Sequence, residues 1–354
     1  MIAKLSDFFI LLFSASVFGG IFFLFAEILY RTKIISAGES YHLLRSVLVF
    51  HLISPIFAAA FFVRSAKPTI LPASGADFDH FTFTELPISY QFYDFYRELR
   101  PLPYLFAIWF IVFLAVFLKR IVKNRHLLTQ LQTISSANTN RDLELLKNQL
   151  MKEYQIRKPI QIQYCALLST PMISNISHIV IFFPQTKLSE QYTEFILRHE
   201  LIHCRRNDIF YKYLLLFVKS FYWFNPLLFL FAHLFHERCE ISCDESLLNR
   251  YTSREQVEYA KCIAGFAGYT KPDLMAGFYC AHTTERRIAA IAAMHSGSRS
   301  HRKKTKVFTG VTFLLLFIIL ILMTANCKVL RIEFGKWMER LHTYNALTAN
   351  YYSP

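Results

Sequence analysis

The sequence has little charge, and acidic residues are the scarcer kind. Only 18% of the 354 residues are Asp, Glu, Lys or Arg, against about 25% in an average soluble domain. The 39 basic and 25 acidic side chains leave a net charge of +14, and 54% of the residues are hydrophobic. This composition excludes a disordered chain and a small disulfide scaffold. It indicates a membrane protein with one basic side.

Four segments lack charge almost completely. They are residues 8–30, 41–63, 102–118 and 307–325. A membrane-spanning helix needs about 20 apolar residues, with about 17 as the lower limit. The sequence therefore predicts three transmembrane helices within residues 1–118, an extracytoplasmic loop at 64–101, and a fourth transmembrane helix at 306–326.

The distribution of Lys and Arg predicts the orientation of these helices. Basic residues follow the first and third segments and precede the fourth, and loops rich in Lys and Arg stay in the cytoplasm. We therefore expect residues 119–305 in the cytoplasm, and the N-terminus and a short tail at 327–354 outside. The excess positive charge of residues 119–305 would attract anionic lipids. A docking surface for an acidic or DNA-associated partner is the alternative interpretation.

The predicted cytoplasmic segment combines helices and strands. Apolar spacing and turn residues predict a linker at 130–140, helices at 140–154 and 188–204, and strands at 160–168 and 176–183. Ser189 is the expected N-cap of the second helix. We expect the second strand to offer an edge with which an extended substrate could pair. A strand that binds no ligand is the alternative.

The second of these helices carries His199-Glu200-Leu201-Ile202-His203. Histidines four residues apart lie on one face of a helix, so both imidazoles can bind a single metal ion. Glu200 lies beside the first histidine and is placed to take a proton from a water molecule that the metal activates. A histidine pair on an ordinary amphipathic helix is the alternative.

A catalytic zinc ion takes three protein ligands, and carboxylates downstream could supply the third. Glu240 and Asp244 are four residues apart and would share one face of a helix. In that arrangement Glu240 would bind the metal, and Asp244 would bind as well or orient a histidine. Cys239 and Cys243 have the same spacing and could instead form a closed, structural Cys₂His₂ zinc site. That alternative leaves Glu200 and Glu240 without a function.

The apolar stretch between the two halves of this motif imposes a geometric constraint. If residues 209–235 crossed the membrane, Glu240 would lie on the opposite side from the two histidines. Asn225 and Pro226 interrupt the stretch, because proline disfavours a continuous helix. We therefore predict a helical hairpin over 209–248 that rests on or dips into the bilayer. A fully buried soluble hairpin is the alternative.

Three short motifs together resemble those of a known family. They are His199-Glu200-x-x-His203-x-x-Arg206-x-Asp208, Trp223-Phe224-Asn225-Pro226-Leu227 and Glu240-x-x-Cys243-Asp244-Glu245. The chain is similar in these motifs, and in the order of its predicted spans, to the BlaR/MecR-type antirepressor metallopeptidases of bacteria. The resemblance implies a membrane α-helical protein of the bacterial cytoplasmic membrane. Its cytoplasmic part, residues 119–305, would be an α+β zincin-like (gluzincin) metalloprotease domain.

The resemblance also implies roles for individual residues. Glu200 would be the catalytic acid and base, and Asp208 and Asp244 would support the metal ligands. The implied ligands of Zn²⁺ are His199, His203 and Glu240. A further group should stabilise the oxyanion during peptide hydrolysis. The candidates for that role are His233, His236 and Arg238.

In that family, a signal from outside activates the protease, which cleaves itself and causes loss of a DNA-bound repressor. Self-cleavage would fall within residues 273–284 here. Expected partners are the lipid bilayer, a protein substrate such as a repressor and, in a homodimer, a second copy of the chain. Direct binding of nucleic acid is not expected, because we find no helix-turn-helix or basic–aromatic pattern. We expect no penicillin-binding sensor domain, so a signal would act through the loop at 64–101, the tail or the membrane.

Two other functions fit parts of the pattern. A membrane-protein quality-control or CAAX-type metalloprotease can share the same ligands, and it would cleave unfolded membrane proteins broadly. A non-catalytic membrane adaptor would use the metal site only for structure. An open catalytic site, unlike a structural one, keeps an exchangeable water molecule and would be inhibited by chelators or hydroxamates.

Overall fold

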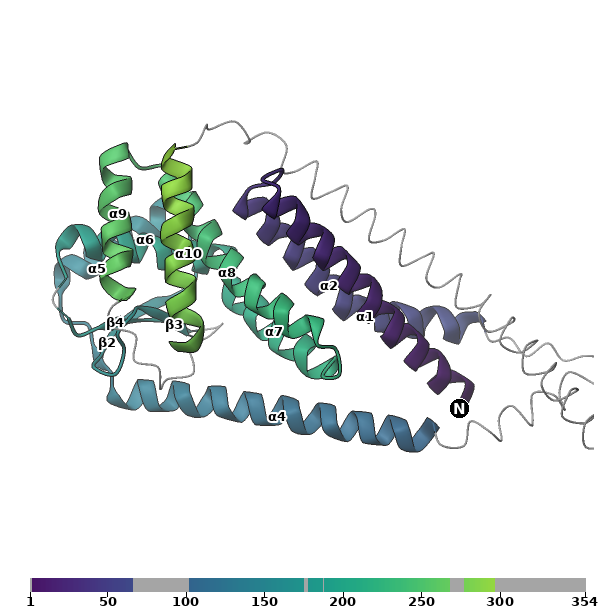
Figure 1. The fold of residues 1–354 in the computed structure, drawn as a ribbon. Coiled ribbons are helices and arrows are strands. Elements are labelled where there is room, and N and C mark those ends of the chain that lie inside the picture. Colours follow the sequence, from purple (N-terminus) through teal and green to yellow (C-terminus); the bar gives the residue numbers. More distant parts are fainter. Residues whose placement is uncertain (1, 66–101, 175–177, 187, 268–276, 297–354) are drawn as a thin grey trace, which may run out of the picture. The chain divides into compact units, whose positions relative to one another are not determined.

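The computed structural model of the protein describes residues 2–65, 102–174, 178–186, 188–267 and 277–296 (Figure 1). The chain divides into two compact units. One unit comprises residues 1–21, 49–113 and 311–354, and the other comprises residues 22–48 and 114–310. The fourth predicted span and the tail lie outside the described residues, as does the loop from residue 66 onward.

Three long helices lie where the first three spans are predicted. They are α1 (Ile2–Arg31), α2 (Ala37–Ser65) and α4 (Leu102–Ile134). Within the described residues, two stretches are long and apolar enough to cross a membrane, Leu12–Arg31 in α1 and Pro103–Ile134 in α4. The first turns of α2 hold Glu39, His42 and Arg45.

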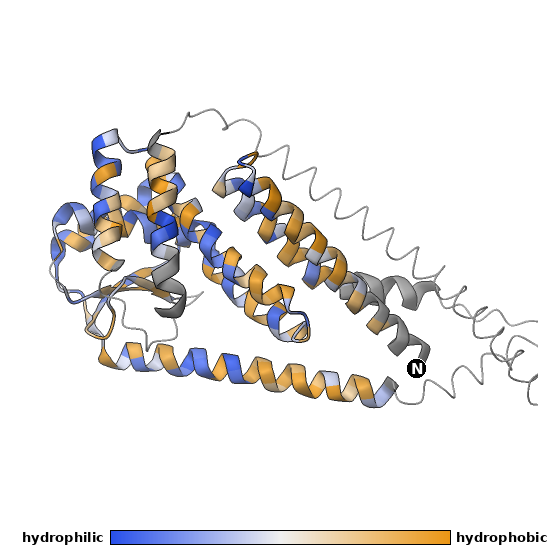
Figure 2. Ribbon diagram, in the orientation of Figure 1, coloured by the Kyte–Doolittle hydropathy of each residue, from blue (hydrophilic) through white to orange (hydrophobic). Residues whose placement is uncertain are grey.

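Apolar side chains of α1 and α4 lie exposed rather than in a core. Figure 2 shows hydrophobic residues along much of α1 and along the N-terminal part of α4. Exposed examples are Phe13, Val17, Ile21, Phe25 and Ile28 in α1, and Leu105, Ile108, Ile111, Leu114 and Val122 in α4. Soluble monomers rarely expose such large apolar patches, which mark membrane or protein contacts.

Helices α1 and α2 approach each other closely within the first unit. A Cβ atom added at Gly19 would lie 2.1 Å from Cε1 of His51, so only glycine leaves room for the histidine ring. Aromatic rings add to this unit, because Phe8 packs edge-on against Phe106 and Trp109, with centroids 5.4 and 5.1 Å away. Such edge-to-face pairs stabilise packing beyond the area that they bury.

The second unit contains a four-stranded mixed sheet with the order β1-β2-β4-β3. Its strands are β1 (Ser136–Ala137), β2 (Ile160–Cys165), β3 (Met172–Ser174) and β4 (Ile179–Pro184). Strands β2 and β4 pair in parallel, while β1 and β3 pair antiparallel to their neighbours. The strand at 176–183 was predicted to be an edge, and this is wrong. All of β4 is buried, and an unbroken apolar run is typical of a strand covered on both faces.

Alternate residues of β4 face two different layers. Ile179, Ile181 and Phe183 belong to the main core, while Val180 and Phe182 pack with Leu131 of α4. Helices α5 (Arg141–Glu153), α6 (Glu190–Arg206), α9 (Ser253–Ala267) and α10 (Gly277–Ser296) contribute to the main core, together with the end of α8 (Leu227–Leu248). Figure 1 shows α4 on the other side of the sheet from these helices. The first half of the predicted linker at 130–140 is therefore wrong, because α4 continues to Ile134 in order to cover the sheet.

The two helices predicted at 140–154 and 188–204 are confirmed as α5 and α6. Asn140 caps α5 by accepting hydrogen bonds from two backbone N–H groups of its first turn. Ser189 caps α6, and its Oγ accepts from the backbone N–H of Tyr192 at 3.2 Å. These caps satisfy N–H groups that have no partner within a helix.

Helices α7 (Asp208–Phe221) and α8 (Leu227–Leu248) lie where the arms of the hairpin are predicted. Asn207, in the left-handed conformation with φ 55°, ends α6 and turns the chain directly into α7. The side chain of Asn225 accepts a hydrogen bond from the backbone N–H of Leu227 at 2.8 Å and so begins α8. The return of the chain brings α8 back against α6.

Candidate metal centre

Helix α6 presents both motif histidines on the side that packs against α8. His199 and His203 are 6% and 4% exposed, and their Nε2 atoms lie 3.1 Å apart. The spacing of four residues produces this arrangement, because side chains one turn apart project from the same face. The backbone of α6 is therefore sufficient to bring two nitrogen donors together.

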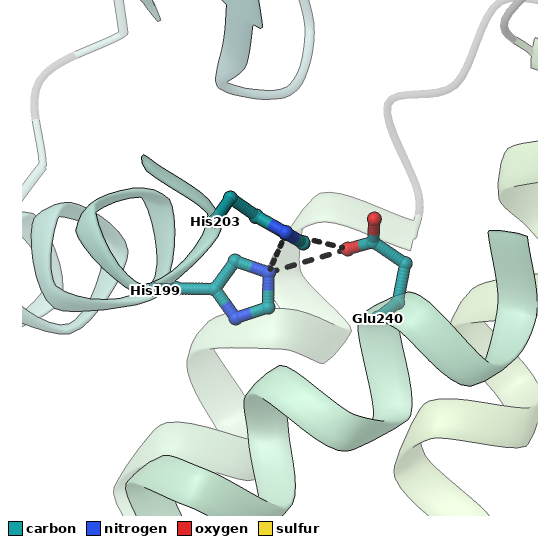
Figure 3. Close-up of side chains that lie close together, drawn as sticks. All are labelled: His199, His203 and Glu240. Carbon is teal, nitrogen blue, oxygen red and sulfur yellow. Dashed lines mark hydrogen bonds and ion pairs between the residues drawn. The ribbon is translucent and has the colours of Figure 1, made fainter. Parts of the chain in front are cut away.

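Helix α8 adds the third predicted ligand. The Oε2 atom of Glu240 lies 3.2 Å from Nε2 of His199 and 3.5 Å from Nε2 of His203. Figure 3 shows the three side chains pointing toward one another. Their donor atoms all lie within 4.8 Å of one another. The hairpin thus unites two residues of α6 with one that is 37 positions further along the sequence.

The Nδ1 atom of His199 faces a second layer of polar groups. It lies 3.0 Å from the hydroxyl of Tyr259 and 3.2 Å from Oδ1 of Asp244. Tyr259 donates its hydroxyl proton to the same Asp244 oxygen at 2.6 Å. Arg287 of α10 donates to both oxygens of Asp244, each at 2.8 Å. Residues from three helices therefore hold Asp244 beside the Nδ1 atom of His199.

The Nδ1 atom of His203 faces a different carboxylate. It donates to Oδ2 of Asp208 at 2.8 Å, and Tyr41 of α2 donates its hydroxyl proton to the other oxygen at 2.8 Å. Nε of Arg206 lies 3.4 Å from Oδ2. Asp208 is 1% exposed, so water cannot replace these partners. The structure thus places Asp208 and Asp244 behind the two histidines.

Both supporting carboxylates are held in the ionised form. Burial alone would raise the pKa of Asp208, but the hydrogen bond from His203 and the charge of Arg206 outweigh it and lower the pKa to about 2. Burial would likewise raise the pKa of Asp244, yet Arg287 and His199 lower it to about 2. An ionised carboxylate can only accept hydrogen bonds. A carboxylate that faces Nδ1 favours a proton on that nitrogen, which would leave Nε2 of each histidine to bind a metal ion.

This donor set fits a zinc ion. Two imidazole nitrogens and one carboxylate oxygen are the ligands of catalytic zinc sites, which leave a fourth position open. Histidine ligands almost always donate their other N–H to a carboxylate or carbonyl, which fixes the ring orientation. Both features are present in this structure, because the three donor atoms lie together and a carboxylate faces Nδ1 of each histidine. The arrangement therefore suits a cation.

The alternative Cys₂His₂ site does not form in this geometry. The sulfur atoms of Cys243 and Cys239 lie 3.3 and 3.7 Å from Nδ1 of His203, on the opposite edge of the ring from His199. Among the described residues, no group of potential metal ligands contains both histidines and both cysteines. The guanidinium of Arg206 also donates to the Cys243 sulfur at 3.4 Å, and a fixed positive charge there opposes a second cation.

Glu200 lies on α6 between the two histidines and is 9% exposed. Among the hydrogen bonds of the described residues, none uses its carboxylate. Its charge acts on Lys212 of α7. Glu200 thus lies beside the candidate metal donors without a hydrogen-bond donor among these residues.

The three oxyanion candidates all lie on α8, where His233 and His236 are half-buried and Arg238 is buried. Arg238 donates to Glu27 of α1 at 3.0 and 3.2 Å, also donates to Glu237, and lies over the ring of Tyr30. The positive charge of Arg238 is therefore paired with acidic side chains of the protein. Burial and the charge of Lys212 lower the pKa of His236 to about 3, so this ring is neutral.

Several residues at the centre escaped the sequence analysis. Nζ of Lys212 lies 3.6 Å from Oε1 of Glu240, although in the sequence it only interrupts an apolar run. A lysine in such a run is itself a sign of function. Tyr41, Tyr259 and Arg287 come from distant parts of the chain, and no local spacing connects them to the histidines.

The chain is similar to a peptidase family and to bacterial regulatory and resistance proteins. The sequence profile of the family described as BlaR1 peptidase M56 matches residues 11–291. The Regulatory protein BlaR1 of Bacillus licheniformis is 23% identical over 210 residues, which cover 59% of this chain and 32% of that protein. The Methicillin resistance mecR1 proteins of Staphylococcus aureus and Staphylococcus epidermidis are 27% identical over 110 residues, covering 30% of this chain and 19% of theirs. The chain therefore spans about a third or less of the length of these relatives.

Proposed function

The chain belongs to the BlaR1 peptidase M56 family, and from that premise we propose that it is a zinc-dependent metalloendopeptidase of the bacterial cytoplasmic membrane that acts in signal transduction. One observation carries the proposal. His199, His203 and Glu240 bring three metal donors within 4.8 Å of one another, and Glu200 adjoins them on α6. The family name supports a peptidase, and the donor set supports zinc.

The protein's own residues divide the work of peptide hydrolysis. His199, His203 and Glu240 would hold the metal, and Asp208 and Asp244 would keep the imidazoles oriented. When bound, zinc polarises a carbonyl group and lowers the pKa of a water molecule. Glu200 accepts a proton from the attacking water and delivers it to the leaving amine nitrogen, as a general base and then a general acid.

The arrangement of elements supports a zincin-like domain of the gluzincin type. The two histidines lie on one helix, the glutamate lies on a second helix beyond a hairpin, and a small mixed sheet packs against the first. In this proposal β3, rather than β4, is the strand whose free edge could receive an extended substrate. The second helix, α8, begins at the turn that Asn225 stabilises, and its length delivers Glu240 to the histidines.

The proposed topology follows from the distribution of charge and of apolar helices. Residues 1–118 and 306–326 would form four transmembrane helices, and residues 119–305 would form the protease domain in the cytoplasm. A cytoplasmic centre implies a cytoplasmic substrate, and the similarity to a regulatory protein and to methicillin resistance proteins supports a role in regulation. We propose cleavage or inactivation of a transcriptional repressor.

Self-cleavage within residues 273–284 is part of the proposal. Residues 273–276 lie outside the described residues, and α10 begins at Gly277. Proteases bind substrates in extended form, so α10 would have to unwind locally before a bond within it could be cleaved.

The direct test replaces Glu200 by glutamine. Glu200→Gln keeps the size of the side chain but removes its ability to accept a proton, so cleavage should fall by about 100-fold or more, while zinc content stays at the wild-type level. The measurement is the appearance of self-cleavage fragments in membranes, identified by N-terminal sequencing, with zinc quantified in the purified protein. Glu190→Gln, at an exposed position of the same helix, is the matched control. Wild-type fragmentation by Glu200→Gln would refute the enzymatic role of this residue.

A further inference from the structure

A single tyrosine of α2 contacts the metal centre through Asp208. Tyr41 lies in the second turn of α2, is fully buried, and donates its hydroxyl proton to Oδ1 of Asp208 at 2.8 Å. The other oxygen of this carboxylate accepts the Nδ1 proton of His203 at 2.8 Å. Tyr41, Asp208 and His203 therefore form an unbroken series of hydrogen bonds that ends at a metal ligand.

The position of Asp208 in the chain makes this contact important. Asp208 begins α7, directly after Asn207, whose left-handed conformation separates it from α6. The backbone of α6 thus orients His203 but does not hold Asp208 in place. The carboxylate is held instead by Tyr41 on one oxygen and by Arg206, 3.4 Å away, on the other. The ring of Tyr41 also lies 4.5 Å from the guanidinium of Arg206, so the tyrosine contacts one of the partners of Oδ2 as well.

The start of α2 is attached to the same helices at a second point. The backbone N–H of Gly38 donates to Oε2 of Glu245, on α8, at 2.8 Å. Glu245 lies five positions after the third metal donor, Glu240. The first turns of α2 therefore bind next to both halves of the metal centre. A hydrogen bond of 2.8 Å cannot survive a shift of one residue, about 1.5 Å, along a helix axis.

We propose that Tyr41 is a positioning residue for the metal ligand His203, and that through it the placement of α2 sets the activity of the metal centre. The inference rests on the proposed function and deepens it. Helix α2 continues to Ser65, where the predicted extracytoplasmic loop begins. A displacement of α2 would withdraw the phenol from Asp208, leave the imidazole free to turn, and so weaken the metal site.

The test removes only the hydroxyl group of Tyr41 in the full-length protein. Mutation of a residue that supports a metal ligand through hydrogen bonds lowers metal affinity or activity by about 10–100-fold. Tyr41→Phe should therefore lower the zinc affinity or the rate of self-cleavage by about that factor. Tyr211→Phe is the matched control, because this tyrosine of α7 stacks on Arg45 at 3.6 Å and is not part of the series. Both variants are purified in detergent and compared with wild type and Glu200→Gln.

Two further measurements separate positioning from a general loss of packing. With Co²⁺ in place of zinc, the absorption spectrum reports the geometry of the ligands, and it should change in Tyr41→Phe but not in Tyr211→Phe. Asp208→Asn should reduce zinc affinity as well, and adding Tyr41→Phe to it should cause little further loss, because residues in one series of bonds are not additive.

The outcomes distinguish the inference from the function on which it rests. Wild-type zinc affinity, cleavage and Co²⁺ spectrum in Tyr41→Phe would overturn the inference, while the loss of cleavage in Glu200→Gln would still support the peptidase. Fully multiplicative effects of Tyr41→Phe and Asp208→Asn would also overturn it. A wild-type protein that binds neither zinc nor Co²⁺ would overturn both.

Discussion

At the scale of single residues, the two histidines of the centre are supported in different ways. His199 relies on Asp244, which Tyr259 and Arg287 hold from α9 and α10. His203 relies on Asp208, which Tyr41 holds from α2. The metal centre therefore depends on parts of the chain on both sides of the motif. Loss of any outer partner should weaken metal binding without removing a ligand.

The depressed pKa of Asp244 makes stability depend on pH. An unfolded aspartate titrates near pKa 3.9, whereas Asp244 in the folded protein has a pKa of about 2. Its contribution to the free energy of unfolding is thus complete above about pH 4 and is lost as the pH falls through about 2, by about 2 kcal/mol. We expect the unfolding temperature, measured in detergent with a chelator, to drop over this interval. Asp244→Asn should show a smaller drop, and an equal drop would contradict the assignment.

At the scale of elements, the hairpin of α7 and α8 decides which residues meet. The turn at Asn225 reverses the chain, so that Glu240 returns to α6 instead of leaving on the far side of an apolar segment. An asparagine stands at the start of the hairpin and another at its turn. Asn207 adopts the left-handed conformation that begins the hairpin, and the side chain of Asn225 accepts a hydrogen bond from the first residue of the returning helix.

Replacement of Asn225 tests this account of the hairpin. Asn225→Ala removes the acceptor for the backbone N–H of Leu227, and the loss of such a cap costs about 1 kcal/mol of stability. We expect a lower unfolding temperature with nearly unchanged zinc affinity, because Glu240 lies more than three turns further along α8. Ser189→Ala, at the cap of α6, is the comparison, since it should destabilise by a similar amount. A large loss of zinc affinity in Asn225→Ala alone would show that the turn directly positions the ligand.

At the scale of the whole molecule, the proposed topology places opposite ends of α4 on opposite sides of the membrane. Its N-terminal part exposes a run of large apolar side chains, while its C-terminal turns cover the sheet of the second unit. One helix therefore serves two environments. Its length of 33 residues exceeds the roughly 20 that a bilayer requires, which leaves several turns for the protein interior.

Labelling of single cysteines tests this topology. In a background with Cys280→Ser and Cys327→Ser, Ser74→Cys should react with a membrane-impermeant thiol reagent in intact cells. Ser300→Cys should react only after lysis, because residues 119–305 are predicted to be cytoplasmic. The remaining native cysteines, Cys165, Cys204, Cys239, Cys243 and Cys262, are buried and should contribute little background. The reverse pattern would invert the topology and place the protease domain outside.

Local patterns in the sequence determined much of this protein. The spacing of His199 and His203, the caps Asn140 and Ser189, and the break at Pro226 each depend on residues a few positions apart. Regular backbone geometry converts such spacings directly into shared faces, helix starts and turns. For the same reason, the placement of the two motif histidines on one helix face and the two arms of the hairpin could be predicted.

Only the tertiary structure decided which distant residues complete the centre. Tyr41 meets Asp208 across 167 positions, and Arg287 meets Asp244 across 43, and neither pairing has a local periodicity. The inner position of β4 was missed because strand order depends on which segments pair, not on the composition of one strand. The helical extent of α4 was missed because packing against the sheet, rather than local polarity, stabilises its last turns. Such contacts depend on the burial together of residues that are far apart in the sequence, and this burial exists only in the folded chain.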